Sequence, residues 1–245
     1  MAGAMARGWA GAEAGPEAML FCDLDRGRAE ALAAEVGGDT RETLAALAGD
    51  CEVVLLAVKP AALDEVAEEL GHAAPALLSV MAATPTGRLR EAFADVPVLR
   101  VMPNQPVEVR RGVICHPPAA GMPADLEARL LGLLEALGSL FAIDEGRMEA
   151  AMAVMSCAPA YVARFAGDLA GAGAAEGLDP GLSLELVAET VAGTAEMLAR
   201  RSPEEVERAV APPGGATEAG LEALAAGGFD DAIDAAVAAS LERFR

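Results

Sequence analysis

The stretch Glu52-Val-Val-Leu-Leu-Ala-Val58 decides how this chain folds. Every residue from Val53 to Val58 is apolar, and Pro60 ends the run. A strand with one solvated face alternates apolar and polar residues, whereas a parallel strand covered on both faces reads as a continuous apolar run. The stretch therefore predicts a buried strand of a parallel sheet.

Extended and helical patterns alternate around this strand as far as about residue 143. Further strands are predicted at residues 19–22, 77–81, 98–101, 112–115 and 140–143. Helices are predicted at residues 2–12, 26–36, 41–48, 63–70, 86–93 and 126–137, and residues 102–106 are predicted to form a loop because of their prolines. This alternation is typical of a doubly wound parallel sheet, so we expect a Rossmann-like α/β fold.

No convincing strand follows residue 144, and the rest of the chain carries helix signals. Asp179 followed by Pro180 predicts an N-cap and the first residue of a helix. Ser202 and Glu205 have the spacing of a capping box. We therefore expect two domains, an α/β domain over residues 1–144 and an all-helical domain over residues 145–245.

The composition excludes several classes of function. The chain has 245 residues, of which 53% are hydrophobic, and a net charge of −20, so nucleic acid and anionic membranes are poor partners. No apolar run is long enough to cross a membrane. The two histidines, His72 and His116, have no ligand-spaced neighbours, so we expect no metal site. The four scattered cysteines favour reduced thiols in a cytoplasmic protein.

Three polar residues follow predicted strands. Asp23, Lys59 and Asn104 each come just after an apolar run, and Lys59 is the only lysine in the chain. An open parallel sheet binds its ligand beyond the carboxyl ends of its strands, and an aspartate there accepts hydrogen bonds from an adenosine ribose. The alternatives are a helix N-cap for Asp23 and a turn former for Asn104.

The second notable stretch is Val210-Ala-Pro-Pro-Gly-Gly-Ala-Thr217. Its two prolines stop one helix, and its two glycines let backbone amides approach a ligand closely. Ala216 and Thr217 then begin the next helix, where unpaired amides and the helix dipole attract anions. The turn predicts a site for a small carboxylate, with a plain helix–helix turn as the alternative.

Together these motifs resemble one family, pyrroline-5-carboxylate reductase, over nearly the whole chain. The resemblance rests on five motifs in order: Met1-Ala-Gly-Ala-Met-Ala-Arg-Gly8, Ala57-Val-Lys-Pro60, Arg100-Val-Met-Pro-Asn-Gln-Pro106, Ser156-Cys-Ala-Pro-Ala-Tyr161 and Pro213-Gly-Gly-Ala-Thr217. It implies an oxidoreductase that transfers hydride from NADPH or NADH to 1-pyrroline-5-carboxylate, giving L-proline. It also implies a homo-oligomer that is a dimer or larger, in which the helical domain binds substrate and dimerises.

The resemblance also implies roles for individual residues. Thr217 would be the catalytic residue, bonding the ring nitrogen, within a substrate site of Gly214, Gly215, Ala216 and Thr217. The residues expected to contact the cofactor are Ala2, Asp23, Arg26, Ala57, Val58, Lys59, Pro60 and Asn104.

Some residues depart from the family pattern. Pro212 stands where the family usually has a serine, which allows a related imine or hydroxyacid reductase as an alternative. Asp23 repels a ribose 2′-phosphate and favours NADH, whereas Arg26 attracts one and favours NADPH. Met1 falls inside the expected Gly-rich turn, so the first strand is not in this sequence. A non-catalytic oligomeric paralogue without cofactor binding is therefore a further alternative.

We expect an in-frame extension of about ten residues upstream of Met1, apolar and ending Gly-x-Gly-x, as the dinucleotide fingerprint requires. Such a strand would lie between the predicted strands 19–22 and 52–58. Sequencing the DNA upstream of the Met1 codon checks this. A stop codon directly before Met1, together with nucleotide binding by the 245-residue chain, would contradict it.

Overall fold

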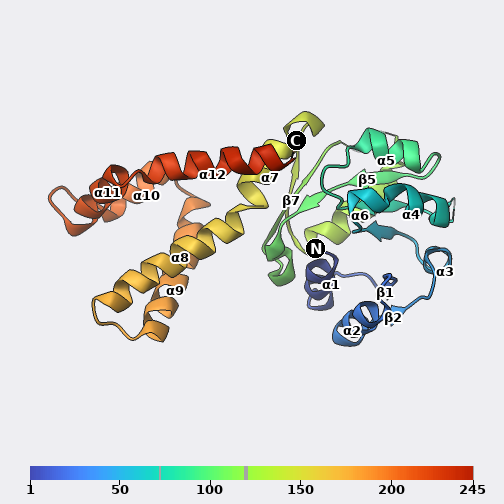
Figure 1. Ribbon diagram of the computed structural model, residues 1–245, viewed down its shortest axis with the longest axis horizontal. Helices are drawn as coiled ribbons and strands as arrows, with labels where there is room; N and C mark the ends of the chain where they lie inside the picture. The colour runs from blue at the N-terminus through green and yellow to red at the C-terminus, as the bar shows by residue number, and fades with distance from the viewer. Residues whose placement is uncertain (72, 119–120, 245) are drawn as a thin grey trace. The chain divides into compact units, whose positions relative to one another are not determined.

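The computed structural model describes residues 1–71, 73–118 and 121–244. The chain forms two compact units, which Figure 1 shows in the colours of the sequence. Unit 1 comprises Met1–Cys157 with the end of the chain from Arg243, and unit 2 comprises Ala158–Glu242. The helix at Met148–Met155 thus belongs to unit 1, although the sequence pattern placed it after the predicted domain boundary.

Unit 1 contains parallel strands arranged in short sheets. β1 (Leu20–Phe21) pairs with β2 (Asp39–Thr40), and β4 (Leu77–Ser79) lies between β3 (Val54–Leu56) and β5 (Val98–Arg100), all parallel. In the third sheet β7 (Gly112–His116) pairs antiparallel with β6 (Met102–Pro103) and parallel with β8 (Gly138–Ala142).

The helices of unit 1 follow its strands in the alternation that the sequence predicts. They are α1 (Ala2–Ala10), α2 (Arg26–Val36), α3 (Leu44–Gly49), α4 (Leu63–Leu70), α5 (Thr86–Ala92), α6 (Ala124–Glu135) and α7 (Met148–Met155). Three short 3-10 helices are η1 (Pro60–Ala62), η2 (Gln105–Val109) and η3 (Glu145–Arg147).

Side chains of the central strands enter two different cores. Val54 and Leu56 of β3 pack into a core with α3, α4 and α5, and Leu55 packs against a second core with α1 and α6. Neighbouring residues divide in the same way in β4, where Leu77 belongs to the first core and Leu78 to the second. Successive side chains of a strand point to opposite faces, so helices cover both faces of this sheet. The predicted doubly wound fold is confirmed.

Some elements differ from the prediction. β2 and β6 are two-residue strands in segments without an apolar run, and β6 lies in the predicted loop 102–106. Both are formed by pairing with a distant strand, which local sequence does not reveal. α3 begins at Leu44 rather than at residue 41, because the Thr43 side chain accepts a hydrogen bond from the Ala46 amide at 3.1 Å.

Unit 2 is helical throughout its described elements. They are α8 (Ala158–Ala175), α9 (Pro180–Leu198), α10 (Pro203–Val210), α11 (Ala216–Ala226) and α12 (Phe229–Phe244). The Asp179 N-cap and the Ser202–Glu205 capping box are both confirmed.

α8 and α9 approach each other closely at a glycine. A Cβ on Gly173 would lie 2.7 Å from the Ser183 hydroxyl, which donates to the Ala170 carbonyl at 2.8 Å. Tyr161 of α8 is also 2.6 Å from the Ser240 hydroxyl of α12. Small residues therefore set the spacing between α8 and α9. Among the described residues, no helix is long and apolar enough to cross a membrane.

Candidate functional site

A cleft of about 270 Å³ in unit 1 brings four of the predicted cofactor residues together. Ala2 of α1, Asp23 after β1, and Ala57 and Val58 after β3 all line it. Ala57 and Val58 are exposed, whereas the strand residues of the cleft are at least partly buried. The cleft thus has polar and exposed residues at the carboxyl ends of its strands and apolar residues between them.

The beginning of α1 suits an anionic group. Its N-cap, Met1, makes no side-chain capping hydrogen bond, so no capping side chain accepts from the backbone amides of the first turn. The residues of this turn, Ala2, Gly3 and Ala4, are small and let an anion approach the backbone. The residues present therefore fit the pyrophosphate of a dinucleotide.

Asp23 and Arg26 both have partners within the protein. Asp23 Oδ1 accepts from the Asp25 amide at 2.9 Å, while Asp25, not Asp23, is the N-cap of α2 and accepts from the Arg28 amide. The alternative prediction, that Asp23 is the N-cap of the following helix, is therefore wrong. Arg26 donates to Glu42 at 2.6 Å, and both side chains are well exposed. An exposed ion pair of this kind is weak and exchanges readily for another anion.

The other predicted cofactor residues lie outside the cleft lining. Lys59 and Pro60 are exposed at the start of η1, where Lys59 has extended backbone. Asn104 is 6% exposed: its amide nitrogen donates to the Met155 carbonyl at 3.0 Å, and its oxygen accepts from the Val113 amide at 2.9 Å. These two hydrogen bonds join the loop to β7 and α7, and the contact of Asn104 with the cofactor stays a prediction.

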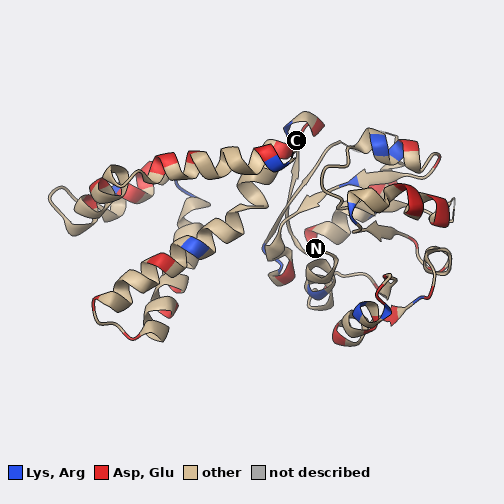
Figure 2. Ribbon diagram, in the orientation of Figure 1, with Lys and Arg blue, Asp and Glu red and all other residues tan. Residues whose placement is uncertain are grey.

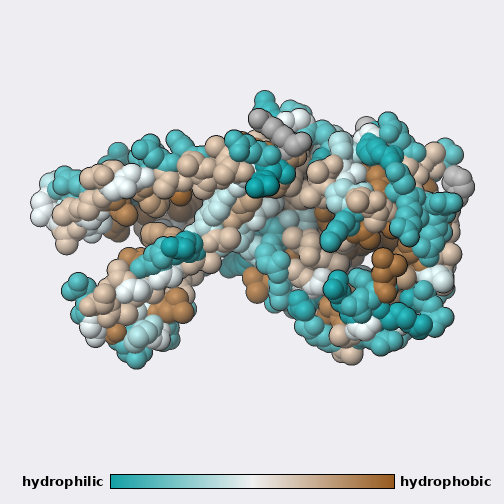
Figure 3. All heavy atoms as spheres, viewed as in Figure 1, coloured by the Kyte–Doolittle hydropathy of each residue, from teal (hydrophilic) through white to brown (hydrophobic). Residues whose placement is uncertain are grey.

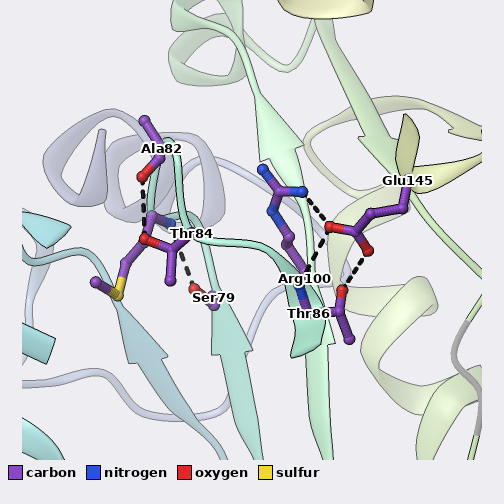
Figure 4. A network of polar contacts seen from close by, with 7 residues as sticks. Ser79, Ala82, Thr84, Thr86, Arg100 and Glu145 are labelled. Carbon is purple, nitrogen blue, oxygen red and sulfur yellow. Dashed lines mark hydrogen bonds and ion pairs between the residues drawn. The ribbon is translucent and has the colours of Figure 1, made fainter. Parts of the chain in front are cut away.

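Arg100, Glu145 and Thr86 form a network that sequence reasoning missed (Figure 4). Arg100 ends β5, is 5% exposed, and donates to the Glu145 carboxylate. Glu145, at the start of η3, also accepts from the Thr86 amide at 3.2 Å and the Thr86 hydroxyl at 2.5 Å. One feature of the sequence indicates this network: Arg100 lies inside the apolar strand Val98-Leu-Arg-Val101. A buried arginine requires an anionic partner.

The predicted substrate turn lies in unit 2, between α10 and α11. Gly214 has a φ of +74°, a backbone conformation that favours glycine, and its amide donates to Glu218 Oε2 at 2.6 Å. The Gly215 amide donates to the Pro212 carbonyl at 3.0 Å, so it is already used within the turn. Gly215 is the N-cap of α11 and has no side-chain cap, which leaves the Ala216 and Thr217 amides as the donors for an anion.

Metal ligands do not gather in the part of the chain that the structure describes. No group of three His, Cys, Asp or Glu side chains there is placed to hold a metal ion. His116 is buried, with its Nδ1 3.1 Å from the Pro117 carbonyl, and His72 lies outside the described residues.

Family models match both parts of the chain. Residues 145–245 match the model described as pyrroline-5-carboxylate reductase dimerisation, and residues 1–83 match the model described as NADP oxidoreductase coenzyme F420-dependent. The pyrroline-5-carboxylate reductase of Synechocystis sp. is 35% identical over 196 residues, covering 78% of this chain and 73% of the relative. That of Aquifex aeolicus is 31% identical, covering 82% and 77%.

Solved structures agree with these matches. 1-Pyrroline-5-carboxylate reductase from Streptococcus pyogenes has a TM-score of 0.89 at 27% identity, covering all of this chain and 94% of that one. Pyrroline carboxylate reductase from Plasmodium falciparum, solved with NADP bound, has a TM-score of 0.85 at 25% identity, covering 98% and 92%.

The buried network gives the stability of unit 1 a specific pH dependence. Burial acts to raise the pKa of Glu145, but hydrogen bonds from the Thr86 hydroxyl and amide and from Arg100 outweigh it and lower the pKa below the ordinary 4.5. A carboxyl whose pKa is lower in the folded state stabilises the fold above its unfolded pKa. That contribution is lost as the pH falls below 4.5 through the folded pKa.

We predict that Glu145→Gln lowers the free energy of unfolding at pH 7 by about 2 kcal/mol, because buried Arg100 loses its charged acceptor. The difference from the wild type should shrink at pH values well below 4.5, where the wild type also loses the charge. Urea unfolding at fixed protein concentration measures both values. Asp144→Asn is the matched control, since that carboxylate is 80% exposed. Equal pH dependence in Glu145→Gln and the wild type would contradict the assignment.

Proposed function

This chain belongs to the pyrroline-5-carboxylate reductase family, and from that premise we propose which of its residues carry the reaction. The enzyme reduces 1-pyrroline-5-carboxylate to L-proline, in proline biosynthesis, with NAD(P)H as the hydride donor. Two groups of residues are involved, the nucleotide-binding residues of unit 1 and the turn before α11 in unit 2. Each is argued from its own geometry.

The nucleotide residues are those at the carboxyl ends of β1 and β3. The uncapped first turn of α1, from Ala2, would bind the pyrophosphate. Asp23 would accept hydrogen bonds from the adenosine ribose, and the exposed loop Ala57-Val-Lys-Pro60 would run along the rest of the nucleotide. Bound NAD(P)H supplies the hydride, and the protein orients the two reactants.

The choice between NADPH and NADH depends on two opposing side chains. Asp23 repels a 2′-phosphate, whereas Arg26 would leave its exposed pair with Glu42 to bind one. The first 83 residues match an NADP oxidoreductase model, and the Plasmodium relative was solved with NADP bound. Both observations support NADP as a cofactor. The preference for NADH that Asp23 predicts is measured by comparing kcat/KM for the two nucleotides in the wild type and in Arg26→Ala.

The turn before α11 carries the proposal for the substrate. Its free Ala216 and Thr217 amides, at the start of an 11-residue helix, would bind the substrate carboxylate. The Thr217 hydroxyl would bond the ring nitrogen and fix which face of the ring receives the hydride. Because the imine is basic enough to enter protonated, hydride adds to the C=N carbon, the π electrons pass to nitrogen, and no strong protein acid is required.

Pro212 replaces the serine that the family usually has in this turn, but the Ala216 and Thr217 amides remain as hydrogen-bond donors. It has no hydroxyl and no amide hydrogen, so it cannot bind the carboxylate as a serine there would. Its carbonyl accepts from the Gly215 amide at 3.0 Å and so fixes the turn. We therefore assign the carboxylate to the helix amides, with Gly214 needed for the left-handed backbone at φ +74°.

We expect Thr217→Ala to reduce kcat/KM for 1-pyrroline-5-carboxylate by one to two orders of magnitude, because it removes one hydrogen bond to the reacting ring. Thr217→Ser keeps the hydroxyl and should retain most activity. Gly215→Val should prevent binding, since a Cβ there lies only 2.9 Å from the Pro212 carbonyl. Steady-state kinetics with both cofactors tests this. Turnover like the wild type in Thr217→Ala and Gly215→Val would remove the turn from the active site.

The enzyme is a homo-oligomer, as its match to the family's dimerisation model shows. We propose that α8 and α9 from two subunits pack together. Of the described residues in unit 2, the buried ones are Ala170, Ser183 and Val206, whereas large apolar side chains of α8 and α9 stay exposed. These exposed side chains are Val162, Phe165, Leu169, Leu182, Leu184, Leu186 and Leu198.

The charge pattern of α8 supports this interface. Only Arg164 and Asp168 are charged in its 18 residues, and they pair with each other at 2.6 Å. Figure 2 shows this helix mostly without charge, and Figure 3 shows apolar side chains at the surface of unit 2. An apolar surface of this extent is typical of a permanent subunit interface.

We predict that Phe165→Asp dissociates the oligomer and abolishes activity, because it places a charge in an apolar interface. Val109→Asp is the matched control, since Val109 is 64% exposed in unit 1. Light scattering at micromolar concentration measures the mass. A monomeric wild type, or an unchanged mass in Phe165→Asp, would contradict the proposed interface.

A further inference from the structure

Glu218 places a negative charge in the turn before α11. Its Oε2 accepts from the Gly214 amide at 2.6 Å, so the side chain reaches back past the start of its own helix. A long helical side chain ordinarily points toward the N-terminus in this way. Glu218 is half-buried, whereas Gly214, Ala216 and Thr217 are exposed. The carboxylate therefore lies at the same helix end as the backbone amides to which the substrate carboxylate is assigned.

The hydrogen bond of Glu218 differs from the usual capping arrangement. A glutamate three residues after an N-cap normally accepts from the amide of the N-cap residue, as Glu205 does from Ser202 at 2.9 Å. Glu218 stands three residues after the N-cap Gly215, but the Gly215 amide donates to the Pro212 carbonyl instead. Glu218 therefore bonds the amide of the residue before the N-cap, and its charge lies in the turn itself.

No basic side chain neutralises this carboxylate. Within the part of the chain that the structure describes, the Gly214 amide is the one polar partner of Glu218. By contrast, Asp168 of α8 pairs with Arg164 at 2.6 Å. A carboxylate has about four lone-pair sites, so one hydrogen bond leaves most of its capacity unused. Glu218 can therefore interact with a cationic group that enters the turn.

The turn thus presents two opposite charges close together. The Ala216 and Thr217 amides at the helix end attract an anion, and the Glu218 carboxylate attracts a cation. Protonated 1-pyrroline-5-carboxylate carries the same pair of charges, because its iminium nitrogen and its carboxylate are bonded to one ring carbon. A 2-oxo acid has the carboxylate alone, and Glu218 would repel it. A site that repels the wrong ligand gains specificity even without new contacts to the right one.

We propose that Glu218 determines the specificity of this turn for zwitterionic cyclic imino acids over oxo acids and other plain anions. The proposal rests on the function proposed above, in which the amides of α11 bind the substrate carboxylate. Glu218 attracts the protonated imine and so favours the form that accepts hydride. It acts on binding rather than on the chemical step, because hydride addition converts the cationic iminium into a neutral amine and weakens the attraction.

Glu218→Gln tests the charge separately from the hydrogen bond, because glutamine keeps an oxygen acceptor for the Gly214 amide. We expect KM for 1-pyrroline-5-carboxylate to rise about fivefold to tenfold, with kcat unchanged or higher. Glu218→Ala should raise KM at least as much. Glu222→Gln is the matched control, since it removes one charge from an exposed position one turn further along α11 and should change neither constant. A normal KM in Glu218→Gln with a raised KM in Glu218→Ala would reduce Glu218 to a capping residue and overturn the proposal.

Two ligands with the same ring size give a result that a merely structural role of Glu218 would not produce. L-Proline is a zwitterion, whereas cyclopentanecarboxylate has the carboxylate without the ring nitrogen. In the full 245-residue chain, Glu218→Gln should weaken the binding of L-proline about fivefold and strengthen that of cyclopentanecarboxylate, because attraction and repulsion are lost together. Isothermal titration calorimetry of the wild type and the variant measures both Kd values and requires no turnover.

The same titrations separate this inference from the function on which it rests. Opposite shifts of the two Kd values in Glu218→Gln support the role of Glu218, and shifts in one direction or no shift overturn it. If Gly215→Val abolishes binding of both ligands while Glu218→Gln changes neither, the turn stays the substrate site and only the role of Glu218 fails. If Gly215→Val binds both ligands as the wild type does, or the wild type binds neither, both proposals fail.

Discussion

The structure of unit 1 depends on covering β3, β4 and β5 on both faces. Their residues divide alternately between a core with α3, α4 and α5 and a core with α1 and α6. Because neither face can be left to water, β3 and β4 are each followed by a helix, α4 and α5, that crosses to the next strand. This places all carboxyl ends of β3–β5 on one edge, from which the loops that bear the candidate cofactor residues leave.

Unit 2 is built on a different principle. It has few buried residues of its own among those described, and α8 and α9 meet through small side chains at Gly173 and Ser183. Its large apolar side chains remain exposed, so the free energy of their burial becomes available only on association. Association in the homo-oligomer that the family match supports would therefore also stabilise this unit.

The enzyme binds anionic ligands although its own net charge is −20. The proposed sites rely on backbone amides at the uncapped N-termini of α1 and α11, which carry partial positive charge without any basic side chain. Among the basic residues, Arg26 is proposed to bind only a ribose 2′-phosphate, and Arg100 pairs with Glu145 inside unit 1. Local dipoles at short range can therefore outweigh a distant negative field that solvent screens.

The sequence alone determined the features that depend on neighbouring residues. The apolar run of β3, the Asp179 N-cap, the Ser202–Glu205 capping box and the turn Pro213-Gly-Gly-Ala-Thr217 follow from backbone preferences and local hydrogen bonds. The family resemblance and the Rossmann-like fold rest on such features, and the comparisons confirm both.

Only the tertiary structure decided what depends on partners distant in the chain. β2 and β6 exist because β1 and β7 pair with them, and the Asn104 side chain bonds to the Met155 carbonyl and the Val113 amide. The Gly215 amide is used within its turn, so the available donors shift to Ala216 and Thr217. The reason is physical: a hydrogen-bonding group takes the partner that folding brings near it, and no local pattern in the sequence records that partner.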